Sequence, residues 1–134
     1  MELSQVRLLV EDFRGCYRFY RDVLGLAPQF EAEDGPYAKF LCDGGTAGIA
    51  LQLRSDMAEF VDDLAARPAG YRSLVVLRVD DVDGYCAEIT GRGAVLVHGP
   101  GPMTDRMRVA HLKDPEGNVI ELQQWLAPRP PSAH

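Results

Sequence analysis

Apolar and polar side chains alternate along the first strand-like run of the chain, residues 5–10. The alternation separates two faces, one with Val6, Leu8 and Val10 and the other with Gln5, Arg7 and Leu9. Apolar side chains then recur at i, i+3, i+4 and i+7 from Phe13 to Tyr20 behind Asp12, a pattern typical of an amphipathic helix with an aspartate N-cap. Three more strand-like runs follow, at 27–32, 37–42 and 47–54, with turns at Asp34-Gly35-Pro36 and Asp43-Gly44-Gly45. Together these runs predict a βαβββ module.

The same order of runs returns 69 residues later. The segment Val10-Glu11-Asp12-Phe13 reappears as Val79-Asp80-Asp81-Val82, and 79 − 10 = 69. The offset also pairs Gly48 with Gly117 and Leu53 with Leu122. The strand-like runs of this second copy cover 74–79, 94–98, 107–112 and 118–125, and its helix runs from residue 82 to about Gly91. Two tandem copies of one module are the simplest account of this repetition.

The repeat predicts an α+β fold in which two tandem βαβββ modules form a curved mixed sheet with helices on the outer face. We expect a single domain over residues 1–134, divided into module one (3–54), a connector (55–70), module two (71–126) and a tail (127–134). Ser55 is the expected N-cap of a short connector helix, whose apolar stripe is Met57, Phe60, Val61 and Leu64. The tail lacks periodicity and is expected to fray.

Composition removes several classes of function. The 134 residues include 20 acidic and 14 basic residues, and the net charge of −6 disfavours binding to nucleic acid. The 3 cysteines are odd in number and lack C-x-x-C spacing, which argues against a disulfide framework and against a thiolate zinc site. No basic and apolar leader opens the chain, and no apolar run reaches the roughly 20 residues of a membrane span. We therefore expect a soluble cytoplasmic protein with no membrane partner.

Two sequence motifs carry a resemblance to a known family. They are Phe19-Tyr20-Arg21-Asp22-Val23-Leu24-Gly25-Leu26 in module one and Asp114-Pro115-Glu116-Gly117-Asn118-Val119-Ile120-Glu121-Leu122 in module two. With the paired βαβββ order, they make the chain similar to the vicinal oxygen chelate superfamily, which includes glyoxalase I, extradiol dioxygenases, fosfomycin-resistance proteins and bleomycin-resistance proteins. The resemblance implies the fold over most of the chain. It leaves the activity open, because the superfamily contains enzymes of several classes and plain binding proteins.

The resemblance also implies where a metal would lie. In metal-dependent members the ligands come from the first and last strands of each module and point to the concave face, which is the sheet face opposite the helices. The matching positions here are Gln5, Gln52, Leu74 and Glu121. Glu121 supplies a charged donor, the glutamines supply only amide oxygens and Leu74 supplies none, whereas a divalent ion needs several strong donors. We therefore predict no metal and no cofactor, with His111 as the one nearby residue that could add a donor.

The alternation of each strand predicts what else lines the concave face. Three arginines, Arg7, Arg54 and Arg78, share it with Trp125, a combination suited to a flat ligand with an anionic or carbonyl-rich group. Alternatively, the arginines end their strands in water beside acidic loops, and Trp125 covers the core. The predicted ligand-binding residues are Gln5, Arg7, Leu9, Gln52, Arg54, Leu74, Val76, Arg78, Gln123 and Trp125. Loops 31–37 and 99–105 could close over such a ligand.

Four functions are consistent with these residues. The first is a metal-free small-molecule binding protein resembling the bleomycin-resistance branch, which could sequester a planar or anionic organic compound. The alternative is a metal-dependent lyase, isomerase or dioxygenase of the glyoxalase type that uses Glu121. Glu121 could also act as a general base without a metal. Finally, the concave face could be a protein interface, and we expect a homodimer because exposed strand edges and apolar concave residues favour pairing.

Overall fold

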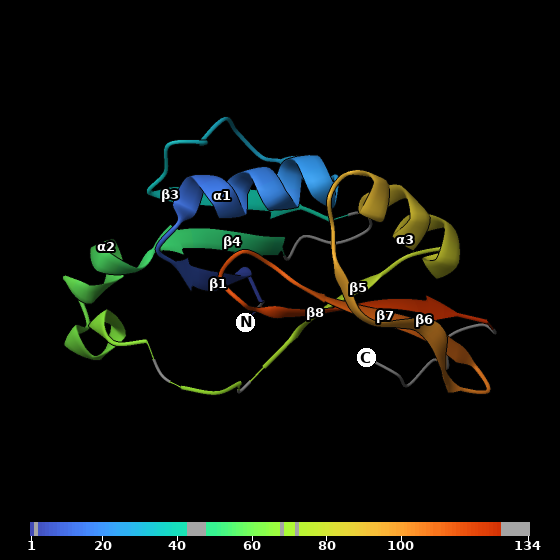
Figure 1. Cartoon of the computed structure of the whole chain (residues 1–134). Helices are drawn as coiled ribbons and strands as arrows, with labels where there is room; N and C mark the ends of the chain where they lie inside the picture. The colour runs from blue at the N-terminus through green and yellow to red at the C-terminus, as the bar shows by residue number, and fades with distance from the viewer. Residues whose placement is uncertain (2, 43–47, 68, 72, 127–134) are drawn as a thin grey trace. The chain divides into compact units, whose positions relative to one another are not determined.

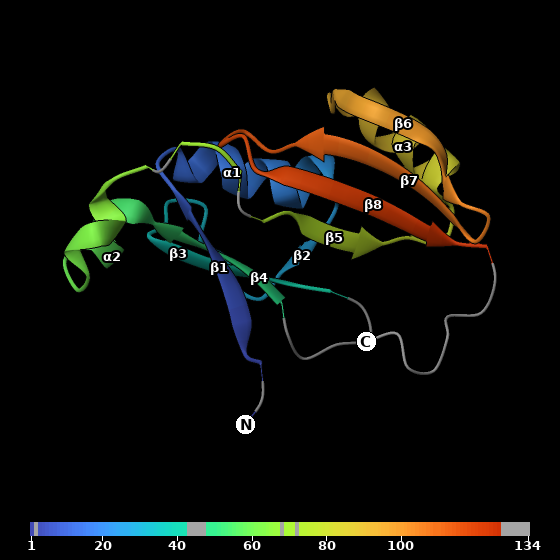
Figure 2. The ribbon, with the colours of Figure 1, turned by 90° about the horizontal axis from the view of Figure 1, so that it is seen from below.

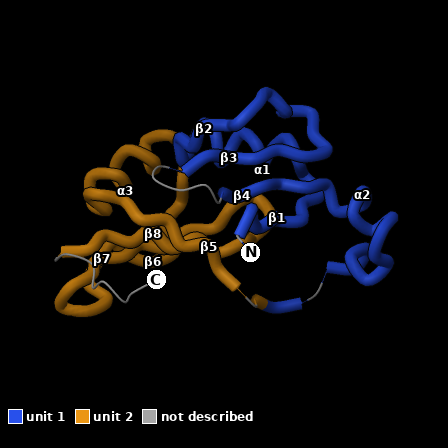
Figure 3. The backbone as a smooth tube through the Cα atoms, turned by 180° about the vertical axis from the view of Figure 1, so that it is seen from behind, with its two compact units in different colours: residues 1–70 blue, residues 71–134 orange. Residues whose placement is uncertain are grey.

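The computed structural model describes residues 1, 3–42, 48–67, 69–71 and 73–126. The chain divides into two compact units, Met1–Gly70 and Tyr71–His134, which have different colours in Figure 3. Each unit contains one four-stranded sheet. The predicted turn at Asp43-Gly44-Gly45 and the predicted tail, 127–134, lie outside the described residues.

The first unit follows the predicted βαβββ order. Its elements are β1 (Gln5–Val10), α1 (Phe13–Arg18), the π-helical turn η1 (Phe19–Val23), β2 (Ala27–Pro28), β3 (Tyr37–Leu41) and β4 (Gly48–Leu53), then the short helices α2 (Arg54–Ala58) and η2 (Asp62–Ala65). The strand order is β1-β4-β3-β2, with β1 parallel to β4 and the other neighbours antiparallel. Helix α1 lies along one face of this sheet (Figure 1), where Phe40 packs against the rings of Tyr17 and Tyr20 at centroid distances of 5.4 and 5.8 Å.

The second unit repeats this architecture. Its elements are β5 (Val75–Arg78), α3 (Val82–Gly91), β6 (Leu96–Thr104), β7 (Met107–Lys113) and β8 (Val119–Trp125). The strands lie side by side in the order β5-β8-β7-β6, as Figure 2 shows, and α3 packs against β6, β7 and β8. The predicted α+β fold of two βαβββ modules is therefore confirmed. No helix within the described ranges is long and apolar enough to span a membrane.

An aspartate caps the main helix of each unit in the same way. The Asp12 side chain accepts a hydrogen bond from the Gly15 amide, and the Asp81 side chain accepts one from the Gly84 amide, each at 3.1 Å. A Cβ atom at either glycine would collide with the capping carboxylate. The motif Asp-x-x-Gly therefore recurs at an offset of 69 because both helices start with the same side-chain cap.

The core of each unit lies between its helix and its sheet. Phe40 and Leu51 in the first unit, and Ile120 and Leu122 in the second, are fully buried. The predicted helix stripes place Cys16 and Cys86 in the same layers, and both are buried cysteines that form no disulfide. Burial raises the pKa of the Cys86 thiol and so disfavours its reactive thiolate form, and the side chain packs as a small core residue.

The last strand of each module departs from the 69-residue offset. In the first sheet Leu9 pairs with Gln52, and in the second Arg78, which follows Leu9 by 69, pairs with Gln123. Since 123 − 52 = 71, β8 has shifted by two residues relative to β5. The shift preserves which face each side chain occupies, because strands alternate with period two. The uniform offset of 69 residues would make Gln52 the counterpart of Glu121, and this is wrong, because the position equivalent to Glu121 is Ala50.

The connector differs from the predicted capped helix. Helix α2 begins at Arg54, its N-cap is Leu53, and no side chain caps it, so Ser55 does not have the predicted role. The expected apolar stripe is also interrupted, because the chain leaves α2 after Ala58 and 81% of the Phe60 surface is exposed. The pattern of four apolar residues was too short to specify one continuous helix.

Two segments expected as closing loops are held in place. Residues 99–104 belong to β6, which pairs with β7 through several register shifts that accommodate its glycines and prolines. The segment before β3 is tied to α1, because Arg14 forms an ion pair with Asp34 and Arg18 forms one with Glu33 at 2.6 Å. The Arg18 guanidinium lowers the pKa of Glu33. Strand β2 is correspondingly short, since the predicted run 27–32 leaves the sheet after Pro28.

Removing one helix cap tests this local account. We expect Asp81→Ala to lower the free energy of unfolding by about 1 kcal/mol, because the Gly84 amide loses its acceptor at the start of α3. Denaturant unfolding monitored by circular dichroism measures the change. The matched control is Asp80→Ala, which leaves the cap in place and should stay within about 0.5 kcal/mol. Equal losses in the two variants would contradict the capping role.

Candidate functional site

The concave face of the first sheet carries a cluster of Gln5, Arg7, Tyr37 and Gln52, called the Arg7 cluster below. In the Gln5 amide orientation that satisfies both neighbours, the nitrogen donates to the Tyr37 hydroxyl (2.6 Å) and the oxygen accepts from Arg7 Nε (3.0 Å). Arg7 Nη1 donates to Gln52 Oε1 at 3.3 Å. The Arg7 guanidinium also lies 5.3 Å from the Tyr37 ring centroid. Strand register explains the grouping, because Tyr37 and Leu9 both pair with Gln52.

In the Arg7 cluster, neutral side chains hold the positively charged Arg7 guanidinium in one orientation. Among the described residues, no carboxylate pairs with Arg7, whose partners are two amides, an aromatic ring and the Met57 sulfur at 3.7 Å. Phe30 stacks on Tyr37 at a centroid distance of 6.1 Å and widens the aromatic surface. Arg7 is exposed, whereas Gln52 is buried. The guanidinium charge is therefore held in a defined direction and left available to an anion.

Arg54 does not join this cluster. Because β4 ends at Leu53, the Arg54 side chain leaves the alternation of the strand, and Nη1 donates to the carbonyls of Leu64 and Ala66 at 3.1 Å each. Nη2 donates to the Leu9 carbonyl at 3.4 Å. These bonds tie the connector to the first sheet. The predicted ligand-binding role of Arg54 on the concave face is not supported by this placement.

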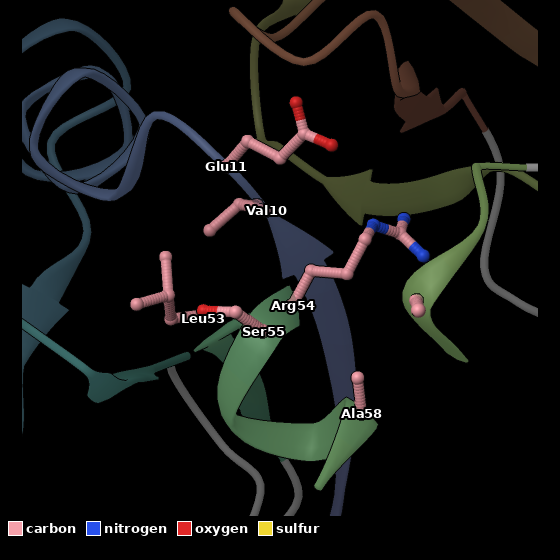
Figure 4. A pocket seen from close by; sticks show the side chains of 7 residues that line it. Val10, Glu11, Leu53, Arg54, Ser55 and Ala58 are labelled. Atoms are coloured by element: carbon pink, nitrogen blue, oxygen red, sulfur yellow. The ribbon is translucent and has the colours of Figure 1, made fainter. Parts of the chain in front are cut away.

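A cavity of about 350 Å³ adjoins Arg54 at the carboxyl ends of β1 and β4 (Figure 4). Apolar side chains, including Val10 and Leu53, form part of its wall, and Glu11 and Ser55 supply polar groups. Arg54 Nε is buried there without a hydrogen-bond partner among the described residues. Glu11 forms an ion pair with Arg67 at 3.6 Å. The cavity therefore offers one buried N–H donor, Arg54 Nε, and the Glu11 carboxylate in its wall is already paired with Arg67.

A continuous hydrogen-bonded chain crosses the concave face of the second sheet. Trp125 Nε1 donates to Gln123 Oε1 at 3.0 Å, and Gln123 Nε2 donates to Glu121 Oε2 at 3.0 Å. His111 Nε2 lies 2.9 Å from Glu121 Oε1, and His111 Nδ1 lies 3.0 Å from His98 Nδ1. Alternate positions on β8 and the pairing of His111 with both Glu121 and His98 produce this geometry. It is called the Trp125–His98 ladder below.

The ladder combines buried and exposed groups. Glu121 is 8% exposed, and His98 at the opposite end from Trp125 is exposed. The predicted residues Val76 and Arg78 pair with Glu121 and Gln123 and so share their face. Leu74 precedes β5, and about half of its surface is exposed, as is that of Val76. The second sheet therefore presents a polar ladder next to an apolar margin.

Two residues of these clusters are absent from the predicted ligand-binding residues: Tyr37 was expected only at the end of a closing loop, and His98 was not expected at the site. Tyr37 opens a strand-like run whose alternation places it with Lys39, and only the register with β4 shows that it meets Gln52. His98 ends the predicted run 94–98, but its pairing with His111 depends on the irregular register of β6. Alternation gives a side chain's face, and it does not give the neighbour on the next strand.

The residues at the implied metal positions do not fit a divalent ion. Gln5 and Gln52 already bond within the Arg7 cluster, and Leu74 has no donor atom. Register places Ala50 in the first sheet where Glu121 lies in the second, so that position lacks a donor as well. In the described part of the chain, no group of three or more His, Cys, Asp or Glu side chains is arranged to hold a metal. His111 contacts Glu121 and leaves the set incomplete.

Known proteins resemble the chain over nearly its whole length. A family model described as Glyoxalase/Bleomycin resistance protein/Dioxygenase superfamily matches residues 2–122. The Bacillus subtilis protein YraH is 35% identical over 130 residues, which cover 94% of this chain and 100% of YraH. A Vibrio cholerae protein named Probable lactoylglutathione lyase is 27% identical over 122 residues, 87% of this chain and 86% of that protein. The crystal structure of TnmS3, an antibiotic binding protein from Streptomyces sp., has a TM-score of 0.71 and 27% identity, covering 93% of this chain and 96% of TnmS3.

The two arginines should respond differently to mutation. We expect Arg54→Met to lower the free energy of unfolding by about 1–3 kcal/mol, because the carbonyls of Leu64, Ala66 and Leu9 lose a charged donor. Arg67→Met is the control in the same connector, since its ion pair with Glu11 is exposed and should contribute at most about 1 kcal/mol. Chemical denaturation measures both. An Arg54→Met variant as stable as the wild type would show that the guanidinium does not hold the connector.

Proposed function

Since the chain belongs to the Glyoxalase/Bleomycin resistance protein/Dioxygenase superfamily, as its motifs indicate, we propose that the protein binds a small organic molecule without a metal ion. One observation carries the proposal. Of the positions implied for a metal, Leu74 has no donor atom and the amides of Gln5 and Gln52 are engaged with Arg7 and Tyr37, while Ala50, the counterpart of Glu121 in the first sheet, has no donor atom either. We therefore assign recognition of the ligand to the side chains themselves and not to a bound metal ion.

The ligand chemistry follows from what the two concave faces offer. The Arg7 cluster presents an oriented guanidinium beside stacked aromatic rings, which suits a carboxylate, phenolate or other planar anion. The second sheet offers Arg78 and the half-buried indole of Trp125. TnmS3, an antibiotic binding protein of similar fold, supports binding as a function that this fold performs. Sequestration of such a compound is the biological use we propose.

A second candidate is the metal-dependent lyase, isomerase or dioxygenase of the glyoxalase type, with Glu121 as its chief ligand. The relative named Probable lactoylglutathione lyase is the observation in its favour. Its weakness is the donor set, because Glu121 bonds His111 and Gln123 while Ala50 and Leu74 contribute nothing. We rank it below metal-free binding for this reason.

Metal content separates the two candidates. We expect purified protein from metal-supplemented medium to contain well under one equivalent of nickel, zinc, iron, manganese or cobalt per chain, because the concave faces lack a sufficient donor set. Elemental analysis by mass spectrometry after gel filtration is the measurement. Glu121→Gln, prepared in parallel, is the control for metal held elsewhere. About one equivalent in the wild type that disappears in this variant would overturn the metal-free proposal.

Ligand binding should depend on the concave arginines. We expect 2-naphthoate to quench the fluorescence of Trp125, the 1 tryptophan of the chain, and Arg78→Met, a change on the same face of the second sheet, to weaken this binding by about 1.5–3 kcal/mol through loss of a charged hydrogen bond. Arg7→Met tests anion binding at the first sheet separately and should weaken it by a similar amount. Fluorescence titration and calorimetry measure the affinities.

Arg54→Met is the matched arginine control, since the Arg54 guanidinium bonds connector carbonyls. It should change the affinity by less than about 0.5 kcal/mol once the variant is shown to be folded. The same loss of affinity in all three arginine variants would point to net charge alone. Unchanged affinity in Arg7→Met and Arg78→Met would place both side chains outside the site.

A further inference from the structure

The cavity beside Arg54 is built entirely from the first unit. Its wall comes from the ends of β1 and β4 and from the connector helices α2 and η2, and its apolar groups include Leu53, Ala58 and Ala65. The described residues in this wall belong neither to the Arg7 cluster nor to the Trp125–His98 ladder, and none of them is aromatic. A volume of about 350 Å³ is at the lower end of the range for ligand pockets, so the cavity suits a small molecule.

One side of the Arg54 guanidinium holds it in this wall. Nη1 donates to the carbonyls of Leu64 and Ala66, and in the view of Figure 4 the side chain lies between Glu11 and Ala58. The opposite edge consists of Nε and Nη2. Nε is buried without a hydrogen-bond partner among the described residues, and the bond from Nη2 to the Leu9 carbonyl is long, at 3.4 Å. This edge therefore lacks a good acceptor, which is unfavourable for a buried donor.

Other arginines of the chain show what the Nε–Nη2 edge binds. In each of three cases both nitrogens donate to one carboxylate at 2.6–3.1 Å, and the pairs are Arg18 with Glu33, Arg21 with Asp22 and Arg108 with Asp83. The edge suits a carboxylate because its two N–H groups point the same way. The partners of Arg54 among the described residues are neutral carbonyls, and the Glu11 carboxylate in the wall pairs with Arg67. Arg54 therefore lacks the group that this edge binds elsewhere in the protein.

We propose that this cavity is a second ligand site, which binds a small aliphatic monocarboxylate. The ligand carboxylate accepts from Nε and Nη2 of Arg54, and the aliphatic tail packs against Leu53, Ala58 and Ala65. One negative charge then balances one guanidinium. Nη1 keeps its bonds to the connector carbonyls, so binding leaves the connector attached. The absence of aromatic rings from the described wall separates this ligand from the planar compounds proposed for the concave faces.

The connector is the part of the wall that admits the ligand. Because Nε is buried, a ligand reaches it only when part of the wall moves. Helices α2 and η2 contain no buried residue, so their displacement disrupts little packing. Val10, on the sheet side of the wall, is fully buried and stays in place. Opening therefore requires movement of the connector and not of the sheet.

NMR of the arginine side chains tests the site in the intact protein. The probe is 3-methylbutanoate at about pH 6, where a carboxylate is ionised, and the Arg54 Nε–H signal is assigned through bonds along its side chain. We expect this signal to move downfield and saturate as the carboxylate becomes its acceptor. The neutral isostere 3-methylbutanamide should bind about tenfold more weakly, because it lacks the charge that strengthens these hydrogen bonds.

Two outcomes of this titration would overturn the proposal. The first is an Arg54 signal that does not move, or that responds equally to the carboxylate and the amide. The second is movement confined to the signals of Arg7 and Arg78, which would place the probe on the concave faces and leave the proposed function intact. Trp125 belongs to the other unit and is no part of this wall, so its quenching by 2-naphthoate is a separate readout.

Filling the cavity is a second test that leaves Arg54 unchanged. Ala58→Leu adds three carbon atoms to the wall and should weaken binding of 3-methylbutanoate at least about tenfold, because the tail loses its space. The variant should fold, since α2 contains no buried residue. Ala87→Leu makes the same change at an exposed position of α3 and should bind like the wild type. Titration of the Arg54 signal measures both affinities, and equal values in the two variants would contradict the assigned site.

Discussion

The parallel pairing of β1 with β4 and of β5 with β8 is the constraint on which the rest of both units depends. A parallel pair brings one face of each strand against the helix that connects the module, so alternate residues become core and the others form the concave face. The two polar clusters on the concave faces follow from that division. The Arg7 cluster and the Trp125–His98 ladder consist of side chains from the concave set, joined across neighbouring strands.

Local patterns in the sequence were sufficient for the fold. Strand β1 matches its predicted bounds, and both main helices begin at the predicted aspartate caps, because alternation, helical spacing and capping act within a few residues. The connector helix was less predictable, since its weak stripe competes with the hydrogen bonds of Arg54 to the carbonyls of Leu64 and Ala66. The motifs that identified the superfamily include the second-module turn, where Asp114 accepts from the Asn118 amide at 2.9 Å.

The candidate site was only partly predictable, because its contacts depend on register between strands. The face of Glu121 and Gln52 was assigned correctly from alternation, but the two-residue shift of β8 makes Ala50 the true counterpart of Glu121. A uniform offset would have placed the amide of Gln52 at the position equivalent to Glu121. The shift places Ala50 there instead, and Ala50 has no atom that could bind a metal. Likewise, His98 meets His111 only because β6 contains bulges, and no periodicity in the sequence encodes them. Alternation along each strand predicts the sheet face on which a side chain lies, and the pairing between strands determines which side chains it contacts.

The central claim is that organic side chains, and not a metal ion, provide recognition. Calorimetric titration of 2-naphthoate into the same preparation tests it directly, once after exhaustive treatment with a chelator and once after addition of zinc or nickel. The account predicts the same affinity and stoichiometry in both titrations, because Arg7, Tyr37 and Trp125 are unaffected by the treatment. Binding that disappears with the chelator and returns with the metal would contradict it.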